Sequence, residues 1–358
     1  MSRTRVIVAM SGGVDSAVAA GLLAREGYDV VGITMRLWTH EDPLAPRYRR
    51  RCCPAEDIDD ARAAAGALGI PHYVVNMEDE FGRRVVDYFV EEYQRGRTPN
   101  PCLPCNEHIK FHALMAHAEA LDAPYLATGH YARIERDAGR YRLFAANDTE
   151  KDQSYVLYML GQQELSRVLF PIAAYRKDEI RALAQDLGLP NAAKPDSADI
   201  CFLPTEDYRD FIAERVPQRE GEIVDSDGSV VGRHRGVAGF TVGQRRGLGV
   251  ALGEKRYVTA IDPSLNVITI GREGDLLASA LTAESLRWVA GAPPADEFEA
   301  GVKIRYRAAS EPATVRIAGD RAVVRFELPL RAVALGQAAV FYRSGEVLGG
   351  GIIASSGP

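Results

Sequence analysis

No stretch of the 358-residue sequence approaches the roughly 20 consecutive apolar residues that a membrane-spanning helix requires. Met1 to Arg5 lead directly into a strand-like run, with neither the apolar core nor the small-residue cleavage site of a secretory leader. No internal repeat stands out. We therefore expect a cytoplasmic protein that has no membrane partner.

Cysteine is scarce, with five residues in the whole chain. In the reducing cytoplasm, cysteines are more often catalytic or metal-binding than joined in structural disulfides. The few thiols of this chain are therefore candidates for chemistry.

The sequence also lacks an excess of positive charge, since its formal net charge is -6. This balance argues mildly against a nucleic-acid partner, because phosphate binding is driven by lysine and arginine. Local basic runs are present all the same, although each run taken singly is also typical of a solvated face. The runs are Arg47, Arg49, Arg50 and Arg51, then Arg233, Arg235, Arg245 and Arg246, and finally Lys303, Arg305 and Arg307.

Hydrophobic residues make up 46% of the chain and charged residues 26%, which is typical of a globular protein, and the length favours two or three domains. Up to about residue 200, short apolar runs alternate with longer helical patterns. This alternation predicts a doubly wound α/β domain with a parallel sheet over residues 1–216. The expected strands are Arg5 to Met10, Val30 to Met35, His72 to Met77 and Tyr125 to Thr128; the expected helices are Ala17 to Arg25, Glu56 to Leu68, Glu80 to Arg95 and His108 to Leu121.

After about Val216 glycine becomes frequent, strands shorten and turn signals follow at close intervals. We expect a small mixed β module over 217–275 and a C-terminal β-barrel domain over 276–358. Alternating runs such as Thr314 to Ile317, Ala322 to Phe326 and Ala338 to Tyr342 favour the barrel.

The most informative segment runs from Val6 to Ser16, where a strand turns through Gly12 and Gly13 into a helix. Glycines let the backbone approach an anion, and the first N–H groups of a helix are unpaired donors. The hydroxyls of Ser11 and Ser16 add to this cradle. The lysine of the GxxxxGK[ST] loop is absent from the chain, so ordinary γ-phosphoryl chemistry is disfavoured.

This segment resembles the signature SGGxDS of the PP-loop ATP pyrophosphatases, which is matched at every fixed position from Ser11 to Ser16. The resemblance implies that ATP is cleaved between its α- and β-phosphates. Mg2+ is inferred from the charge of the triphosphate, with Asp15 as a candidate ligand through water. The competing interpretation is an incidental glycine turn. Gly247-Leu248-Gly249 opens no helix and is expected to be a loop without a nucleotide role.

Further motifs resemble the tRNA-specific 2-thiouridylase family, whose members make 2-thiouridine at the wobble position of tRNA. They are Gly96 to Asn106, Ala127 to Tyr131, Lys151 to Tyr155, Asp199 to Phe202, Gly243 to Gly249 and the closing Gly349 to Ile353. The resemblance implies that Cys201 accepts a persulfide and that Cys105 is its partner nucleophile. It implies ATP contacts at Ala9, Met10, Ser11, Gly12, Gly13, Val14, Asp15, Ser16, Met35 and Gly129.

The same resemblance places Asn100, Pro101 and Cys102 against the target base. The residues that it assigns to the rest of the tRNA are His130, Lys151, Asp152, Gln153, Arg305, Tyr306 and Gln337. Two of these have ordinary structural alternatives. His130 fits a hydrogen-bonding residue at a strand end, and Tyr306 fits an aromatic of the barrel core.

The replacement of a uracil oxygen by sulfur requires two steps, activation of the oxygen by ATP and delivery of a sulfur nucleophile. A uracil C2 oxygen is a poor leaving group, and transfer of AMP to it makes it a good one. Sulfur must then arrive as a nucleophile, and a persulfide or bound sulfide serves better than a thiol, whose pKa of about 8.5 keeps it mostly protonated. The persulfide route needs two cysteines, one that carries the extra sulfur and one that releases it through a disulfide.

One departure from the family changes what is inferred. Well-known members have an aspartate at the first position of the D-x-x-C segment, where this chain has Cys102, so a carboxylate role cannot be carried over. Cys102, Cys105 and Cys201 are instead candidate ligands of a [4Fe-4S] cluster with one iron open to sulfide. The persulfide route, this cluster and a structural zinc site that includes Cys52 or Cys53 all stay open, and packing is the simplest role for Cys52 and Cys53.

Two other functions compete: another PP-loop ATP pyrophosphatase, of the amidotransferase synthetase or tRNA lysidine synthetase type, and a non-catalytic RNA-binding iron-sulfur protein. The expected partners are a tRNA with uridine at the wobble position and a sulfur-donor protein or sulfide source. The sequence does not identify the donor, the tRNA isoacceptors or the oligomeric state.

Overall fold

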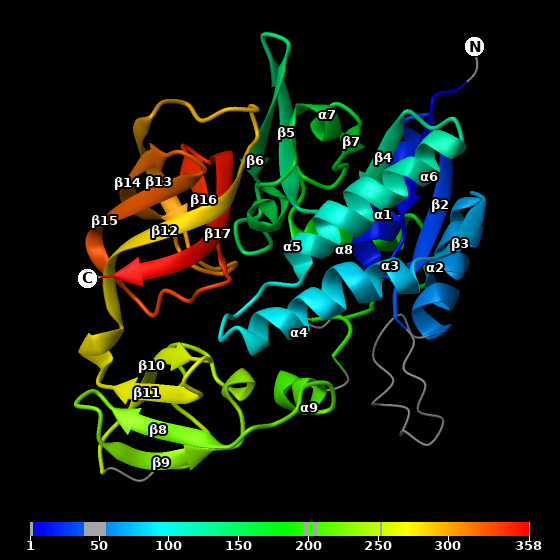
Figure 1. Cartoon of the computed structure of the whole chain (residues 1–358). Helices are drawn as coiled ribbons and strands as arrows, with labels where there is room; N and C mark the ends of the chain where they lie inside the picture. The colour runs from blue at the N-terminus through cyan, green and yellow to red at the C-terminus, as the bar shows by residue number, and fades with distance from the viewer. Residues whose placement is uncertain (1–2, 39–54, 196–199, 204–206, 251–252, 358) are drawn as a thin grey trace.

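The computed structural model describes residues 3–38, 55–195, 200–203, 207–250 and 253–357. Figure 1 shows three bodies, with an α/β body beside a β-barrel and a small β module below the barrel. Cys52, Cys53 and the basic run Arg47 to Arg51 lie outside the described residues. Within the described part of the chain, no helix has the length and apolarity needed to cross a membrane.

The α/β body is built on a five-stranded sheet in the order β3-β2-β1-β4-β7, in which all neighbours are parallel. Side chains of a strand alternate between its faces, so Val6 and Val8 pack into one core and Ile7 and Ala9 into another. A sheet buried on both faces explains the continuous apolar run of the first strand. The strands are β1 (Arg5–Ala9), β2 (Asp29–Arg36), β3 (His72–Asn76), β4 (Tyr125–Thr128) and β7 (Val168–Leu169).

Helices cover both faces, which confirms the doubly wound class predicted for this part. On one face lie α1 (Val14–Arg25), α2 (Ala55–Leu68) and α8 (Lys177–Asp186). On the other lie two longer helical runs, each interrupted by a π-helical segment. The first joins α3 (Glu78–Phe81), η2 (Gly82–Val86) and α4 (Asp87–Gln94), and the second joins α5 (Cys102–Pro104), η3 (Cys105–Ala113) and α6 (Leu114–Ala120).

The second run differs from its prediction, which began at His108. It begins six residues earlier, at Cys102, and Cys105 opens the nine-residue π-helical segment. Such segments are rare and are frequent at functional sites.

The small module is a four-stranded mixed sheet in the order β10-β11-β8-β9. Its strands are β8 (Gly221–Asp225), β9 (Val230–His234), β10 (Tyr257–Asp262) and β11 (Val267–Gly271). Gly247 and Gly249 lie in a loop at positive φ, as predicted. Arg233, Arg235, Arg245 and Arg246 are all exposed, so the second basic run is available to a partner.

The C-terminal strands close into the predicted barrel, in the order β12-β15-β14-β13-β16-β17 with β12 pairing β17. Buried residues of these strands, such as Val302, Val324 and Phe341, form its core. The strands are β12 (Leu277–Trp288), β13 (Glu297–Lys303), β14 (Glu311–Ala318), β15 (Arg321–Arg331), β16 (Ala338–Arg343) and β17 (Glu346–Gly357).

A hairpin of the α/β body extends the barrel sheet, a feature that the sequence patterns did not predict. Its strands β5 (Ala132–Asp137) and β6 (Arg140–Ala145) stand between the two bodies in Figure 1. β6 pairs antiparallel with β17, and Arg142 forms an ion pair with Glu346 at 2.5 Å. The sheet thereby reaches eight strands.

The remaining elements are short helices between these strands and helices. They are η4 (Ser154–Leu157), α7 (Gln162–Leu165), α9 (Tyr208–Ala213), η5 (Val237–Gly239) and η6 (Glu273–Leu276).

Candidate active site

The glycine turn predicted to bind phosphate lies between the carboxyl end of β1 and the start of α1. Ser16 Oγ accepts the Ser11 N–H at 3.1 Å and donates to the Gly13 carbonyl at 3.1 Å, which holds the turn. Gly12 has φ +77°, and a Cβ there would lie 2.3 Å from the Asp57 carbonyl oxygen. Both conditions require glycine.

Gly129 lies directly after β4, next to the turn. A Cβ at Gly129 would stand 2.7 Å from the Ser16 nitrogen. The carboxyl ends of two adjacent parallel strands, β1 and β4, therefore meet here, which is where α/β sheets bind their ligands. The structure thus brings together Gly129 and the loop that the sequence proposed for ATP.

Three further residues hold the loop, none of which was proposed from the sequence. Tyr131 donates its hydroxyl to Asp15 at 2.8 Å, and Lys177 contacts both oxygens of the same carboxylate at 2.8 Å. Asn191 donates its side-chain N–H to the Gly12 carbonyl at 3.0 Å. They lie 116 to 179 positions from their partners, so no local pattern reveals them.

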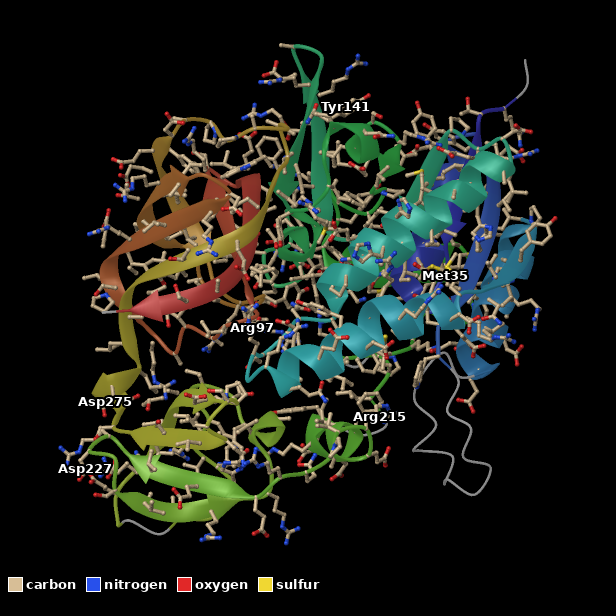
Figure 2. All side chains as sticks on the ribbon, in the orientation of Figure 1. Met35, Arg97, Tyr141, Arg215, Asp227 and Asp275 are labelled. Carbon is tan, nitrogen blue, oxygen red and sulfur yellow. The ribbon has the colours of Figure 1, made fainter. Side chains whose placement is uncertain are left out.

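Met35 lies near the end of β2, beside the first strand of the site, where Figure 2 labels it. Its neighbour Thr34 is buried and donates to the Met10 carbonyl at 2.7 Å. Met10 N–H in turn donates to the Ile33 carbonyl at 2.8 Å. These bonds fix the end of β2 against the start of the loop, as an ATP contact at Met35 would require.

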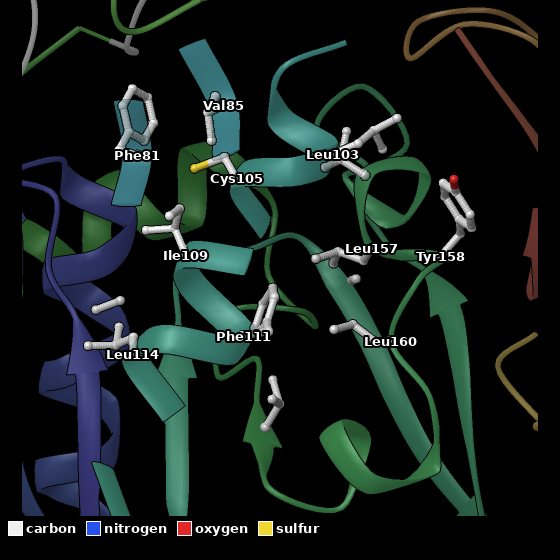
Figure 3. Close-up of a cluster of buried hydrophobic side chains, with 14 of the residues drawn as sticks. Phe81, Val85, Leu103, Cys105, Ile109, Phe111, Leu114, Leu157, Tyr158 and Leu160 are labelled. Carbon is white, nitrogen blue, oxygen red and sulfur yellow. The ribbon is translucent and has the colours of Figure 1, made fainter. Parts of the chain in front are cut away.

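Cys105 is buried, with 8% of its surface exposed, in the apolar cluster on the second face of the sheet. Figure 3 shows its sulfur among Val85, Phe81 and Ile109. Cys102 is half-buried one turn earlier, and its N–H donates to the Asn100 side chain at 3.0 Å. The Asn100 side chain therefore satisfies one of the unpaired N–H groups at the start of the cysteine-bearing run.

Cys201 is exposed, but its neighbour Phe202 is fully buried. The Phe202 ring lies 5.8 Å from that of Phe81 and 5.2 Å from that of Phe89. Phe81 is also beside Cys105 in Figure 3. One aromatic cluster thus anchors the segment of Cys201 on the helical run that covers Cys105.

The three described cysteines carry thiols and form no disulfide with one another. Across the residues that the structure covers, no three His, Cys, Asp or Glu side chains are grouped so that they could hold a metal ion. In this arrangement the described Cys102, Cys105 and Cys201 are therefore not grouped as the ligand set of one iron-sulfur cluster.

The barrel contacts the segment that precedes the cysteines. Gln337 donates to the Thr98 carbonyl at 2.8 Å, and the Thr98 N–H donates to the Leu335 carbonyl at 2.7 Å. Arg97 forms an ion pair with Glu284 of β12 at 3.4 Å, and Figure 2 shows Arg97 between α4 and the barrel. The barrel therefore holds the segment that leads into the cysteine-bearing run.

Tyr306 lies between β13 and β14 of the barrel, near Cys102 and Asp152. Burial, with Asp152 and Cys102 as nearby negative groups, raises the pKa of its phenol to about 12. Gln153 lies within hydrogen-bonding reach of the same phenol. Four residues that the family resemblance singled out therefore meet at one place. Arg305 next to it is exposed, and its guanidinium donates to the Ala332 carbonyl.

Asp152 is enclosed, with 8% exposed surface. Its carboxylate accepts the N–H groups of Ala146 and Ser154, the Ser154 hydroxyl and the ammonium of Lys303 at 3.0 to 3.1 Å. Lys303 is a barrel residue, so the third basic run is partly used for this internal pair. Lys151 beside it is half-buried, and its N–H donates to the Asp148 carbonyl.

His130 is also buried, between the rings of Phe111 and Phe170. Burial, and secondly the charge of Lys110, hold the pKa of its imidazole well below the usual value. It hydrogen-bonds to Thr128 at 2.7 Å. This is the environment expected of a structural residue at a strand end.

Three family models match the chain in succession. The tRNA methyl transferase HUP domain matches residues 4–205, the tRNA methyl transferase PRC-barrel domain matches 209–272, and the aminomethyltransferase β-barrel domain matches 278–353. The domain boundaries drawn from the sequence, after 216 and after 275, stay predictions.

Curated relatives match almost end to end. A tRNA-specific 2-thiouridylase of Carboxydothermus hydrogenoformans is 47% identical over 99% of this chain and 98% of its own length. That of Chloroflexus aurantiacus is 50% identical over 98% of both chains, and that of Geobacter metallireducens is 49% identical over 98% and 97%.

Likeness to solved structures is weaker. A 4-thiouridine synthetase solved with RNA and ATP is 17% identical over 60% of this chain and 50% of its own, with a TM-score of 0.36, and supports no argument about function. The relatives, by contrast, cover both the cysteine segments and the loop, and their description is more specific than that of the family models. By its sequence along nearly its whole length, the chain belongs to the tRNA-specific 2-thiouridylase family.

Proposed function

We propose that this chain is a tRNA uridine sulfurtransferase that uses ATP to replace the C2 oxygen of the wobble uridine, position 34, with sulfur. Family membership supports the reaction class. The observation that carries the proposal is a chain of contacts that leads from the loop toward Cys102. Tyr131 donates its hydroxyl to Asp15 and its N–H to Gln153, and both Gln153 and Cys102 lie near the Tyr306 phenol.

The first step is adenylation of the uracil C2 oxygen. The backbone N–H groups of Gly12 to Asp15 and the hydroxyls of Ser11 and Ser16 suit the phosphates of ATP. The carbonyl oxygen attacks the α-phosphorus, pyrophosphate leaves, and AMP remains on the oxygen. Asp15 is a carboxylate that suits Mg2+ through water, and the metal would neutralise charge on the leaving pyrophosphate.

The second step is sulfur transfer. The terminal sulfur of a persulfide on Cys201 attacks C2 and AMP leaves with its oxygen. The thiolate of Cys105 then attacks the Cys201 sulfur, forms the Cys105–Cys201 disulfide and releases the thiocarbonyl. A thiol reductant must return two electrons before the next turnover. Cys201 is exposed, so it is suited to receive sulfur from a donor protein. Cys105 is buried, so its thiol must be uncovered before it attacks the Cys201 sulfur.

The RNA contacts that we propose are shared by the catalytic domain and the barrel. We assign Asn100, Pro101 and Cys102 to the target base; Cys102 lies near Tyr306 and is bonded to the Asn100 side chain. We assign Lys151, Gln153, Arg305 and Gln337 to contacts with the rest of the tRNA. We assign Asp152 and His130 to positioning, because both are enclosed. A base in an anticodon loop is extruded at lower cost than one in a duplex.

The test is incubation of the protein with ATP, unmodified tRNA and a persulfide donor, followed by mass analysis of the nucleosides. We expect one oxygen-to-sulfur exchange, with AMP and pyrophosphate released. The variant Cys201→Ser should lose thiolation by about 100-fold or more, because its hydroxyl cannot carry a persulfide, and still release pyrophosphate when tRNA is added.

Outcomes of this test separate the competing functions. Undiminished turnover of Cys201→Ser would favour another PP-loop pyrophosphatase, whose chemistry needs no sulfur-handling cysteine. A protein that only binds RNA would release no pyrophosphate at all. Full activity after anaerobic purification with no bound iron would remove the cluster route.

A further inference from the structure

We propose that Lys177 is an ATP-binding residue whose ammonium contacts the pyrophosphate part of the nucleotide. This inference rests on the proposed use of ATP. The glycine loop contains no lysine, unlike the GxxxxGK[ST] loop, whose lysine reaches the β- and γ-phosphates. The structure supplies a lysine to the same loop from a helix 162 positions away.

The contacts of Lys177 place its charge at the loop. The ammonium lies 2.8 Å from both carboxylate oxygens of Asp15, inside the SGGxDS motif. The side chain is only 13% exposed and lies over the Tyr131 ring, 6.0 Å from its centre. The Lys177 N–H donates to Asp148 at 3.0 Å, which fixes the start of α8. The backbone that carries this lysine is thus anchored.

Electrostatics explains why a cation is needed here. The carboxylate of Asp15, alone at the loop, would repel a triphosphate at close range. Lys177 cancels that charge, and its flexible four-carbon chain lets the ammonium bridge the carboxylate and a phosphate. Negative charge grows on pyrophosphate as it leaves, so an ammonium already in place stabilises that transition state without reorganisation.

A second lysine near the loop is less suited to this role. Lys194 lies 2.5 Å from carboxylates of both Asp57 and Asp60. Both acidic partners of Lys194 lie in α2, outside the SGGxDS motif, whereas Lys177 contacts Asp15 within that motif. Lys177 is therefore the better phosphate ligand of the two.

The test compares Lys177→Met and Lys177→Arg with the wild-type protein. The readout is the Kd for Mg2+ and a non-hydrolysable ATP analogue, measured by calorimetry without tRNA. We expect Lys177→Met to weaken analogue binding by about 10-fold to 100-fold and Lys177→Arg to weaken it less. Pyrophosphate release with tRNA should fall at least as much as binding.

The control is Arg25→Ala, which removes another ion pair between α1 and α8, at 2.7 Å from Asp186 and far along both helices from the loop. It should leave analogue binding within about twofold. If folded Lys177→Met also stays within twofold, the proposal is wrong and the pair only joins the helices.

A double variant separates direct contact from simple neutralisation. If Lys177 served only to cancel Asp15, then Asp15→Asn combined with Lys177→Met would restore wild-type affinity, which would overturn the phosphate contact. We expect the double variant to stay weak also when binding is measured without Mg2+, where the loss of Asp15 as a metal ligand does not contribute. If Lys177→Met does not fold, Lys177→Gln replaces it. Failure of the wild type to release pyrophosphate would count against the proposed function, whereas the binding comparison would still decide the role of Lys177.

Discussion

The buried imidazole of His130 has its protonation and tautomer fixed by its neighbours. Lys110 approaches Nε2 at 3.4 Å and, as an ammonium, only donates, so Nε2 accepts. Nδ1 then carries the proton and donates to the Thr128 hydroxyl at 2.7 Å. Burial and Lys110 lower the pKa, so the folded protein keeps this residue neutral under acidic conditions in which the unfolded chain is protonated.

This difference predicts an acid sensitivity of stability. Below the ordinary pKa of about 6.5, the unfolded state binds a proton that the folded state does not, so the free energy of unfolding decreases as pH falls. One group contributes up to about 1.4 kcal/mol per pH unit. His130→Asn keeps an N–H near Nδ1 and removes the titration. Its urea unfolding curves between pH 7.5 and 5 should show a shallower decline than those of the wild type.

Two other histidines, His72 and His234, also have pKa values lowered first by burial, so the wild-type slope contains more than one contribution. The difference between the two proteins isolates His130. Parallel declines would show that His130 titrates normally in the folded state.

The segment from Arg97 to Cys105 is an element whose position depends on the barrel. Gly336 of the barrel has φ +86°, and a Cβ there would lie 2.9 Å from the Arg97 Cβ and 3.1 Å from the Thr98 nitrogen. Close packing of Gly336 against Arg97 and Thr98 thus fixes the position of the segment that leads to Asn100 and Cys102. Any side chain at 336 would push the segment away.

We predict that Gly336→Ala lowers the kcat of thiolation by about 10-fold, because a shift of about 1 Å in a reacting group is costly. The Kd for the ATP analogue should not change. Gly319→Ala is the matched control, since Gly319 also has positive φ, +64°, but its Cβ would meet nothing within 4 Å. Steady-state thiolation assays of both variants test this prediction. Equal losses of kcat would mean that backbone strain alone, and not a shift of the segment, lowers the rate.

Sequence patterns predicted elements best where the signal is local. β4 was predicted over its observed bounds, and the Ser11 to Ser16 turn was recognised because its glycines and hydroxyls are contiguous. The β5–β6 hairpin was missed because its strands carry charged residues on a surface ribbon, although Ala138-Gly139 offered a turn signal. Lys177 and Asn191 could not be found, because only the tertiary fold brings them to the loop.

At the scale of the whole molecule, one buried ion pair joins catalytic domain and barrel. Asp152 and Lys303 are 3.1 Å apart, with side chains 5% and 19% exposed. The ammonium also lies 4.9 Å from the centre of the Tyr342 ring. Removing one partner leaves the other charge buried, which costs more than the pair contributes.

Lys303→Met should therefore destabilise the protein by about 3–5 kcal/mol and should loosen the joint between the bodies. Arg62→Ala removes an exposed pair with Asp59 and should cost less than about 1 kcal/mol. Denaturant unfolding measures the loss of stability. Hydrogen exchange of the amides of β13 and of Ser154 measures the weakening of the contact between the domains. A loss as small as that of the control would mean that this enclosed pair contributes no more to stability than an exposed one.

The hairpin that crosses into the barrel sheet also constrains how the chain can be made. Arg142 emerges from the ribosome 204 residues before Glu346, its partner on β17. Until the last strand is synthesised, one edge of β6 is unpaired and can pair with other chains. Arg140 and Arg142 of β6 oppose such pairing by charge repulsion. Cutting the gene between the α/β body and the barrel would make that temporary edge permanent.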